Sequence, residues 1–292
     1  MTRSQDTPIE TVVVDGLALA NQLRDEMAKE IAELVAAGRR PPSLSVVLVG
    51  DDPASRSYIR GKQRACARIG ADSSEHLLPA STSEAELLAL IERLNADDGV
   101  DGILVQLPLP PQISPEKVAE AIDPAKDADA LHPLNFGRLL LGNAKLVSCT
   151  PLGVLAILDR HEIPIEGAHA VVIGRSNIVG KPVSILLQQR NATVTMCHSR
   201  SRDLPALCRR ADILVAAVGR PGMVKADWIK PGAAVMDVGV SEVDGKLVGD
   251  VDFESARGVA GLITPSRRGI GPMTITMLLR NTLNAYRART GS

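Results

Sequence analysis

Short apolar runs alternate with amphipathic segments along the first 107 residues. The run SLSVVLVG at 43–50 is nearly all apolar, which is typical of a strand covered on both faces. The segment before it, 16–38, has apolar residues at helical spacing and ends on a glycine, as a capped helix does. This alternation predicts an α/β unit with a parallel sheet. The expected elements are helix 16–38, strand 43–50, a helix containing Tyr58 and Lys62, strand 76–80, helix 83–95 and strand 100–107.

The alternation resumes after an irregular, proline-rich middle at 108–151, which contains one short expected helix at 114–123. Two α/β units joined in this way predict two domains flanking a cleft, where ligands of such proteins usually lie. We set the domains at residues 1–149, completed by the C-terminal helix 272–292, and at 150–271. The second series comprises strands at 168–174, 192–199, 211–219 and 232–240, a helix after the first strand, and a last helix at 272–289.

Composition supports this picture and narrows the class of partner. A chain of 292 residues is near the length at which single cores stop growing, so two domains are the default expectation. Its 45% hydrophobic and 23% charged residues are ordinary for a globular protein. The 33 Lys and Arg nearly balance the 34 Asp and Glu, which leaves no net field to hold nucleic acid or an anionic membrane. A small-molecule partner is therefore favoured.

The sequence shows no targeting, membrane or disulfide pattern. The start MTRSQDTPIE lacks the apolar stretch of a signal peptide, and no run approaches the roughly 18 apolar residues of a membrane span. We therefore expect a cytoplasmic protein. Cys66, Cys149, Cys197 and Cys208 form no C-x-x-C pair, so neither a disulfide framework nor a zinc site is predicted. We expect reduced thiols, most of them buried.

The stretch AHAVVIGRSNIVGKP has the form of a phosphate-binding turn. It places Gly174 at the end of a buried strand and Gly180 where a helix should begin. Glycines there let the backbone approach a diphosphate, and the helix N-terminus supplies free N–H groups. The spacing G-x-x-x-x-x-G differs from the usual G-x-G-x-x-G, so a tight strand-to-helix turn without a ligand stays an alternative.

The end of the following strand favours NADP over NAD. An NAD site would have Asp or Glu there to hold the ribose hydroxyls. This chain has Cys-His-Ser-Arg-Ser-Arg at 197–202, and Arg175 lies in the preceding turn. Cations and hydroxyls in place of a carboxylate suit a ribose phosphate. Taken singly, Arg200 and Arg202 also fit the simpler interpretation of solvated loop charges.

Tyr58 and Lys62 form a candidate catalytic pair. Their spacing puts both side chains on one face of a helix, about one turn apart. Gln106 follows a buried strand at the edge from which parallel sheets present functional groups, so its side chain could accept a hydrogen bond from Lys62. A base near neutral pH requires the pKa of Lys62 to fall from about 10.4, which burial or another cation achieves.

The Tyr58–Lys62 pair has two other interpretations. The first is a plain helix-surface pair with the lysine stem along the ring. The second is the Y-x-x-x-K pair of short-chain dehydrogenases, but there the glycine turn precedes the tyrosine, whereas here Gly174 follows Tyr58.

Asp127 and Asp129 form a carboxylate cluster in a loop where Asp often only makes turns. The single histidines at 132 and 198 receive no catalytic role.

Taken together and in order, these stretches resemble the bifunctional methylenetetrahydrofolate dehydrogenase/cyclohydrolase family. The resemblance implies oxidation of 5,10-methylenetetrahydrofolate to 5,10-methenyltetrahydrofolate with NADP, and then hydrolysis to 10-formyltetrahydrofolate in the same cleft. It also implies an N-terminal folate-binding catalytic domain, a Rossmann-like NADP-binding domain and a homodimer formed through the latter. The matching stretches, from Asp15 to Asn284, are VGDDPASRSYIRGK, DGILVQLPLP, KDADALHPLNFG, SCTPLG, GRSNIVGKP, VTMCHS, GDVDF and GIGPMT.

The resemblance also implies roles for single residues, and it requires no metal. Lys62 would be the general base of hydrolysis, oriented by Gln106. Tyr58 would pack on the aminobenzoyl ring, and Asp129 would accept hydrogen bonds from the amidine-like edge of the pterin. Pro272 of GIGPMT would complete the substrate site. The implied cofactor-binding residues are Thr150, Gly174, Arg175, Ser176, Gly180 and Ser199.

Two departures from the family pattern leave alternatives open. Ala130 stands where D-V-D-G is usual, and Arg267 and Arg268 replace Pro-Gly in TPSRRGIGPMT at 264–274. If the family glycine has positive φ, an arginine there adds strain. The loop would then be rearranged, or an arginine would reach an anionic group such as a folate glutamate tail. A catalytically silent NADP- or folate-binding protein and a dehydrogenase lacking cyclohydrolase activity stay open as alternatives.

Overall fold

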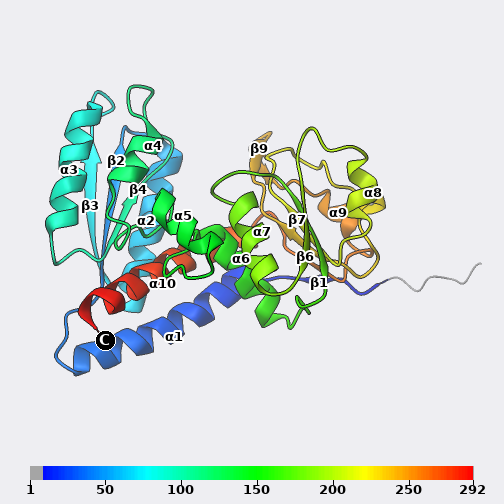
Figure 1. Cartoon of the computed structure of the whole chain (residues 1–292), viewed down its shortest axis with the longest axis horizontal. Coiled ribbons are helices and arrows are strands. Elements are labelled where there is room, and N and C mark those ends of the chain that lie inside the picture. Colours follow the sequence, from blue (N-terminus) through cyan, green and yellow to red (C-terminus); the bar gives the residue numbers. More distant parts are fainter. Residues whose placement is uncertain (1–8, 292) are drawn as a thin grey trace, which may run out of the picture. The chain divides into compact units, whose positions relative to one another are not determined.

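A computed structural model describes residues 9–291, and the chain divides into two compact units (Figure 1). One unit comprises Thr150–Thr274 and the N-terminal segment that ends at Leu19. The other comprises Ala20–Cys149 and the C-terminal residues from Ile275. The boundary between them falls inside the first helix, α1 (Gly16–Ala36), and inside the last, α10 (Ile270–Thr290). The predicted two-domain α/β class is confirmed.

The unit that begins at Ala20 contains a three-stranded parallel sheet in the order β3-β2-β4. The predicted strands and helices are present, with ends that differ by a few residues from the sequence pattern. Serine and glutamate at 83 and 86 form a capping box that starts α3. The elements are β2 (Ser43–Val49), α2 (Pro53–Ile69), β3 (Asp72–Leu78), α3 (Glu84–Ala96), β4 (Gly102–Val105), α4 (Pro115–Ala121) and α5 (Pro133–Leu140).

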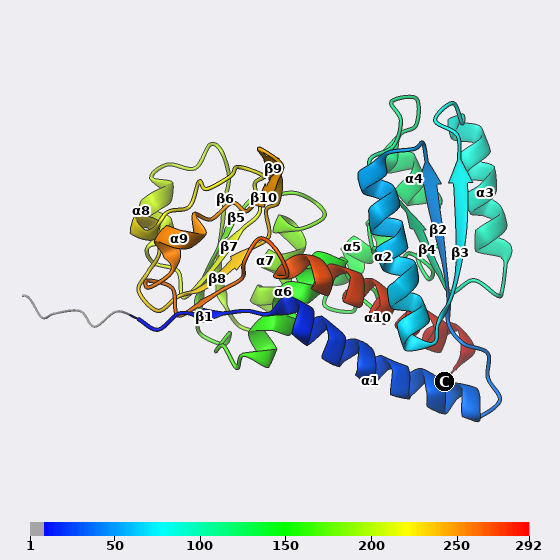
Figure 2. The same cartoon turned by 180° about the vertical axis from the view of Figure 1, so that it is seen from behind.

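Alternation along the strands decides which side chains face which helices. The odd-numbered residues of β2 and β4, such as Val47 and Ile103, pack with α3 and α4 in one buried cluster. The even-numbered residues point to the other face, where a side chain at Gly102 would meet Thr282 of α10. Figure 2 shows α2 and α3 on opposite sides of the sheet. A side chain at position 106 therefore points toward the face that α2 covers.

The unit that contains Thr150–Thr274 is built on a six-stranded sheet in the order β1-β11-β8-β7-β5-β6, with all strands parallel. Its central strands are the predicted ones, shortened at both ends. The edge strands β1 (Val12–Val13) and β11 (Leu262–Ile263) were not predicted, because two residues show no periodicity. The central elements are α6 (Cys149–Arg160), β5 (His169–Ile173), α7 (Gly180–Gln189), β6 (Thr193–Cys197), α8 (Leu204–Cys208), β7 (Ile213–Ala216), η1 (Ala226–Trp228) and β8 (Ala234–Asp237).

A small antiparallel hairpin follows β8 and was also missed by the sequence pattern. It pairs β9 (Ser241–Val243) with β10 (Lys246–Val248), and α9 (Phe253–Ala256) comes next. Its turn is Asp244-Gly245, and both residues have positive φ, of 50° and 72°. An Asp-Gly pair between two short strands is the common signal for this type of turn, so this hairpin could have been found in the sequence.

All four cysteines are free and buried, as predicted. Between residues 9 and 291, the helices are too short or too polar to span a bilayer.

The loop before α10, in which Arg267 and Arg268 replace the Pro-Gly of the family, has a strained backbone at Arg268. Arg268 adopts φ of 63°, in the left-handed region that favours glycine. Its carbonyl accepts a hydrogen bond from the N–H of Leu17, at 3.1 Å. Its guanidinium donates to the carboxylate of Asp15 at 2.8 Å, and both side chains are at least half exposed. The anionic group that Arg268 reaches in this structure is thus Asp15, and such an exposed pair contributes little, about 0–1 kcal/mol.

This strain predicts an unusual order of stability among variants. We expect Arg268→Gly to unfold with a free energy about 1 kcal/mol higher than Arg268→Ala, because both lose the ion pair but only glycine relieves the left-handed backbone. At Arg267, whose φ is not positive, alanine should be the more stable of the same two replacements. Urea unfolding of the four variants measures both differences. Equal stabilities of the two Arg268 variants would contradict the strain.

Candidate functional site

The predicted contact between Lys62 and Gln106 is present in the structure. Lys62 lies on α2, and its Nζ donates a hydrogen bond to Gln106 Oε1 at 2.7 Å. Gln106 follows β4, where its own N–H donates to the carbonyl of Val47 at 2.8 Å. Its Nε2 donates to the Leu107 carbonyl at 2.7 Å. Because the amide nitrogen is used in this way, the amide oxygen faces the lysine and holds the amine in one place.

Burial changes the acidity of this lysine. It lowers the pKa of Lys62, because the charged ammonium loses contact with water. Negative charge at Asp129 acts in the opposite direction, and so do the thiols of Cys149 and Cys66 to a smaller extent. The net lowering of the pKa increases the share of neutral amine near neutral pH. A neutral amine can accept a proton, as a general base must.

The loop at 127–130 presents one carboxylate to the lysine and uses the other for structure. Asp127 is buried and accepts hydrogen bonds from the N–H of His132 and from Asn135 Nδ2, at 2.8 and 2.9 Å. Burial raises the pKa of Asp127 although these hydrogen bonds oppose the rise. Asp129 is only half-buried and lies close enough to act on the charge of Lys62. Asp127 therefore anchors the loop, and Asp129 is the carboxylate whose charge acts on the amine.

The methyl group of Ala130, the other departure from the family pattern, is accommodated in this loop. Ala130 has φ of 54°, so a non-glycine residue adopts a left-handed conformation here too. Its side chain is buried with Leu146 and Ala285 in a small apolar cluster. The packing of the methyl group offsets part of the strain.

The sequence pattern missed Asn281 of α10, which holds this loop from behind. Its Nδ2 donates to the carbonyls of Ala128 and Val147, both at 2.8 Å. Cys149 Sγ donates to the same Ala128 carbonyl at 3.4 Å, and burial keeps the pKa of this thiol well above its ordinary value. The sequence offered no signal for it, because Asn281 is one of several polar residues in α10. Asn281 thus links both loops that adjoin the lysine.

The remaining predicted substrate residues divide between the two units. Tyr58, on α2, leaves 56% of its surface exposed, so its ring is available to stack on a planar ligand. Pro272 lies on α10 within the other unit. The two histidines without an assigned role make local caps: His132 Nδ1 accepts the Leu134 N–H at 2.9 Å, and His198 Nδ1 accepts the Arg200 N–H at 3.2 Å.

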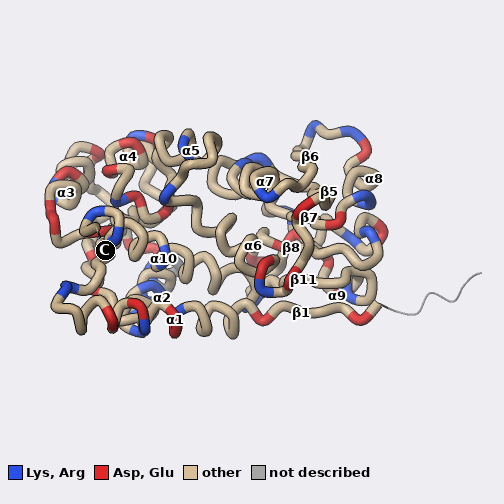
Figure 3. Tube along the Cα trace, turned by 60° about the horizontal axis from the view of Figure 1, so that its bottom comes forward, with Lys and Arg blue, Asp and Glu red and all other residues tan. Residues whose placement is uncertain are grey.

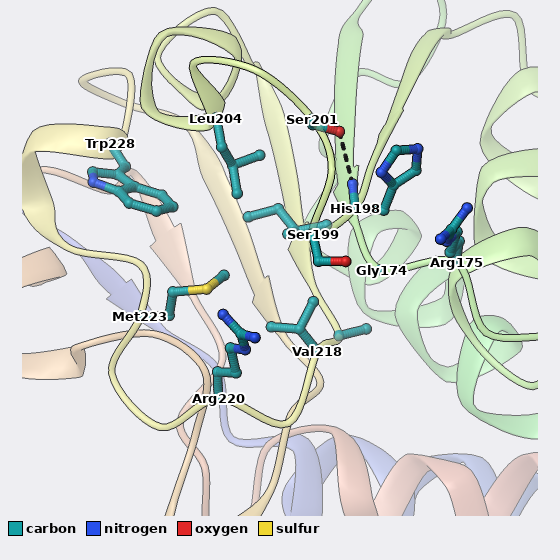
Figure 4. A pocket seen from close by; sticks show the side chains of 12 residues that line it. Gly174, Arg175, His198, Ser199, Ser201, Leu204, Val218, Arg220, Met223 and Trp228 are labelled. Atoms are coloured by element: carbon teal, nitrogen blue, oxygen red, sulfur yellow. Dashed lines mark hydrogen bonds between the residues drawn. The ribbon is translucent and has the colours of Figure 1, made fainter.

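A second site lies in the unit that contains Thr150–Thr274. A cavity of about 610 Å³ opens at the carboxyl ends of β5, β6 and β7 (Figure 4). In the sheet, β5 lies between β7 and β6, so the chain leaves β5 in one direction and later returns to its other side. Such a switch point is where open parallel sheets bind nucleotides. The lining residues are Ile173, Gly174, Arg175, His198, Ser199, Ser201, Leu204, Ala217, Val218, Arg220, Met223 and Trp228.

The lining of this cavity suits an anionic ligand. Arg175 and Arg220 both belong to the lining, one after β5 and the other after β7, and the lining includes no carboxylate (Figure 4). Ser201 Oγ accepts the N–H of His198 at 2.9 Å, which shapes the turn after β6 and leaves Ser199 exposed at the rim. Arg200 and Arg202 lie in the segment between β6 and α8, which carries basic positions in Figure 3. Arg220 was not singled out from the sequence, although it directly follows the apolar run at 211–219 that contains β7.

Two predicted glycines are needed for backbone packing around the cavity. Gly174 has φ of 123°, and a Cβ there would overlap the carbonyl of Ala217. A Cβ at Gly180 would overlap the backbone of Gly174. Ser176 Oγ accepts the N–H groups of Val179 and Gly180 at 3.2 and 3.3 Å, at the start of α7. These contacts hold the turn from β5 into α7 in one conformation.

Three of the predicted cofactor residues do not line the cavity. Gly180 and Ser176 support the turn behind Gly174. Thr150 lies on α6, where its hydroxyl is 3.0 Å from that of Thr274. Gly174, Arg175 and Ser199 are in the lining. Among the described residues, no group of three or more His, Cys, Asp or Glu side chains is arranged to hold a metal ion.

Two family models match the chain over most of its length. The tetrahydrofolate dehydrogenase/cyclohydrolase catalytic domain matches residues 14–129, and the NAD(P)-binding domain of the same family matches residues 148–290. Bifunctional protein FolD 3 of Rhizorhabdus wittichii is 56% identical over 285 residues, which cover 96% of this chain and 94% of that protein. Bifunctional protein FolD of Geotalea daltonii is 54% identical over 278 residues, which cover 95% and 99%.

Solved structures agree with these matches. The bifunctional enzyme FolD from Campylobacter jejuni superposes with a TM-score of 0.93 at 43% identity, covering 96% of this chain and 99% of that one. The methylenetetrahydrofolate dehydrogenase-cyclohydrolase of Trypanosoma brucei, solved with NADP cofactor and an inhibitor, has a TM-score of 0.92 at 40% identity. The superposition with the second structure covers 97% of this chain and 99% of the other.

Proposed function

Since the chain belongs to the tetrahydrofolate dehydrogenase/cyclohydrolase family, we propose that it is active in both reactions. It oxidises 5,10-methylenetetrahydrofolate to 5,10-methenyltetrahydrofolate with NADP and then hydrolyses this product to 10-formyltetrahydrofolate. The observation that carries the proposal is the amine of Lys62, held by Gln106 at 2.7 Å with its pKa lowered by burial. A protein that only bound folate or NADP would have little use for such an amine.

We assign the two ligands to separate domains. The unit of Ala20–Cys149 and the residues from Ile275 is the folate-binding catalytic domain, and the unit that contains Thr150–Thr274 is the NADP-binding domain. These bounds differ from the predicted 1–149 with 272–292 and 150–271, because β1 pairs with β11 in the six-stranded sheet and the first residues of α10 belong to the same unit. Support for NADP comes from the cavity at the sheet switch point, where Arg175 and Arg220 lie in the lining and no carboxylate does. When bound, NADP supplies the acceptor for the hydride. Arg175 and Arg220 neutralise phosphate charge, while Gly174 lets the ligand approach the backbone.

The two reactions differ in whether they need an acid or a base from the protein. Hydride loss needs no acid or base, because an adjacent nitrogen lone pair stabilises the cation that forms. Hydrolysis needs proton transfers. Water adds to the methenyl carbon and loses one proton, then a ring carbon–nitrogen bond breaks as the new hydroxyl loses its proton to become the formyl carbonyl, and the leaving nitrogen gains a proton. One proton is released overall, because the positive charge of the methenyl group is lost. Neutral Lys62 takes the proton from water as the new carbon–oxygen bond forms, and its ammonium can return one to the nitrogen.

The neighbours of Lys62 position it and the substrate. Gln106 fixes the amine without adding charge, since its amide oxygen is a neutral acceptor. Asp129 accepts hydrogen bonds from the paired donors of the pterin. Tyr58, with its exposed ring, stacks on the aminobenzoyl group. These roles are proposals for the individual residues.

Gln106→Glu should shift the pH profile of hydrolysis. A carboxylate at this position would lie against the lysine ammonium and raise the pKa of Lys62, because the charged form gains a partner. Hydrolysis requires the neutral amine, so the rate rises as pH passes upward through this pKa. The rising limb in the variant should therefore move to higher pH, and the rate at neutral pH should fall at least about tenfold. Stopped-flow rates measured with methenyl substrate give both profiles.

Gln112→Glu is the matched control, since Gln112 donates to the Ala80 and Thr82 carbonyls, whereas Lys62 donates to Gln106. Its profile should coincide with that of the unmodified enzyme. A Gln106→Glu profile that shifts to lower pH would reject the proposed protonation state of the amine.

One spectrophotometric assay separates the candidate functions. Methylenetetrahydrofolate and NADP should give the methenyl absorbance, followed by its decay as hydrolysis proceeds. No methenyl signal at high protein concentration would leave a silent binding protein. A signal that accumulates and decays no faster than without enzyme would leave a dehydrogenase that lacks cyclohydrolase activity.

The quaternary structure and location are further parts of the proposal. We place a homodimer contact on the NADP-binding domain. Its β9–β10 hairpin leaves apolar Val243 and Leu247 exposed, at 42% and 46%, as an interface would require. Light scattering should give twice the 30.9 kDa of one chain, and a single-chain mass at micromolar concentration would reject the dimer. A cytoplasmic location stays a prediction that fractionation can test.

A further inference from the structure

Two buried carboxylates lie behind one wall of the arginine-lined cavity. Asp237 ends β8 and is 3% exposed, and Asp250 follows β10 and is fully buried. Neither residue lines the cavity, and the family resemblance assigned a role to neither. Isolated buried carboxylates are costly, so the groups that hold them indicate what they do.

The carboxylate of Asp250 accepts hydrogen bonds from the backbone of the turn that follows β7. Its Oδ2 accepts the N–H groups of Val218 and Gly219 at 2.6 and 3.1 Å, and its Oδ1 accepts the N–H of Arg220 at 2.6 Å. Three consecutive amides are thus directed at a single carboxylate. Val218 and Arg220 of this turn line the cavity, and the guanidinium of Arg220 projects into it (Figure 4).

Asp237 in turn holds Asp250. The N–H groups of Asp250 and Val251 donate to the Asp237 carboxylate at 2.9 and 3.2 Å. The N–H of Asp237 donates to Thr264 Oγ1 at 2.8 Å, which ties it to the segment after β11. Burial raises the pKa of Asp237 to about 7, and the neighbouring charge of Asp250 adds to the rise.

Two glycines make room for these carboxylates. A Cβ at Gly239 would overlap the carboxylate of Asp250, and a Cβ at Gly249 would overlap that of Asp237. Each glycine therefore admits the carboxylate of the opposite segment, and the two segments interlock at the base of the hairpin. We call Asp237, Gly239, Gly249 and Asp250 the carboxylate clasp. A turn at the surface needs neither buried carboxylates nor glycines that make room for them.

We infer that Asp250, fixed by Asp237, is a positioning residue for the dinucleotide site: it holds the turn at 217–220 so that Arg220 and Val218 form the cofactor-facing wall. This inference rests on the proposed binding of NADP in the cavity. It assigns the clasp to cofactor affinity and gives it no part in hydrolysis, which uses Lys62 of the other domain.

The test compares Asp250→Asn with the unmodified enzyme. The amide of the variant turns an N–H₂ group toward a backbone N–H in either orientation, so at least one amide of the turn loses its acceptor. We expect the KM for NADP to rise about tenfold or more, with a smaller change in kcat and with hydrolysis of methenyl substrate within about twofold. Direct titration of NADPH fluorescence should show the same loss of affinity. The amides at 218–220 should exchange faster with deuterium.

Asp252→Asn is the matched control from the same segment. Asp252 caps α9 by accepting the N–H of Ser255 at 3.3 Å, and it does not touch the turn. The affinity of Asp252→Asn for NADP should equal that of the unmodified enzyme. Asp237→Asn keeps an acceptor for the Asp250 N–H and serves as the milder variant if Asp250→Asn does not fold. We expect a severalfold rise in the KM for NADP from it.

The outcomes distinguish this inference from the proposed function. If the unmodified enzyme fails to bind NADPH, the proposed cofactor site is wrong. If it binds and a folded Asp250→Asn binds equally well, the positioning role is wrong. Equal losses of oxidation and hydrolysis in the variant would also overturn the role, because they would show that the clasp serves stability alone.

Discussion

Lys62→Met is expected to leave an enzyme that oxidises its substrate but no longer hydrolyses the product. Methionine has a similar length and fills the partly buried site, but it can neither accept nor return a proton. Removing a positioned general base typically costs about 10²–10⁴-fold in rate. Oxidation should persist, because hydride loss needs no base. In the two-step assay, methenyl absorbance should therefore rise as before and then remain.

Lys117→Met provides the control for this substitution. Lys117 is an exposed lysine of α4 that pairs with Glu84 at 2.6 Å, and its side chain is 64% exposed. The same chemical change at this position should alter neither step. Hydrolysis at the unmodified rate in Lys62→Met would reject Lys62 as the base. Loss of both steps in a folded variant would mean that the lysine is needed to bind folate.

Gly174→Ala should produce the opposite loss. Gly174 has φ of 123°, and a Cβ there would overlap the Ala217 carbonyl, a backbone atom of the adjacent strand's turn. Relief of this overlap displaces either the turn that leads from β5 into α7 or the turn at 217–220. A displacement of about 1 Å at a positioning element can cost about a hundredfold. We expect the KM for NADP to rise by that order while hydrolysis of methenyl substrate continues.

Gly222→Ala is matched to this change within the same unit. Gly222 also has positive φ, of 62°, but an added Cβ would meet nothing within 4 Å. It should lower the free energy of unfolding by about 1 kcal/mol through backbone strain and leave NADP affinity unchanged. Steady-state kinetics in NADP and urea unfolding measure both effects. An unchanged KM in Gly174→Ala would show that the turn can shift without affecting the cofactor.

The contact between Lys62 and Gln106 could be predicted because two local patterns determine it. Helical spacing places Lys62 on one face of α2, and strand alternation directs position 106 toward the face that α2 covers. The sequence predicted strain at Arg268 if that position has positive φ, which it has. It did not predict that Asp15 would be the partner of the Arg268 guanidinium. The two residues are 253 positions apart, and no local pattern relates them.

The amino-acid sequence by itself determined the α/β class, the central strands of both sheets, and the lysine, glutamine and glycines of the two sites, because these follow from periodicity over a few neighbouring residues. Only the tertiary structure decided which residues form the cavity wall. Ser176 and Gly180 support the turn instead of lining the cavity, and Arg220 enters it. The carboxylate clasp joins Asp250 to amides about thirty positions away, and such pairings depend on how strands are ordered in the sheet.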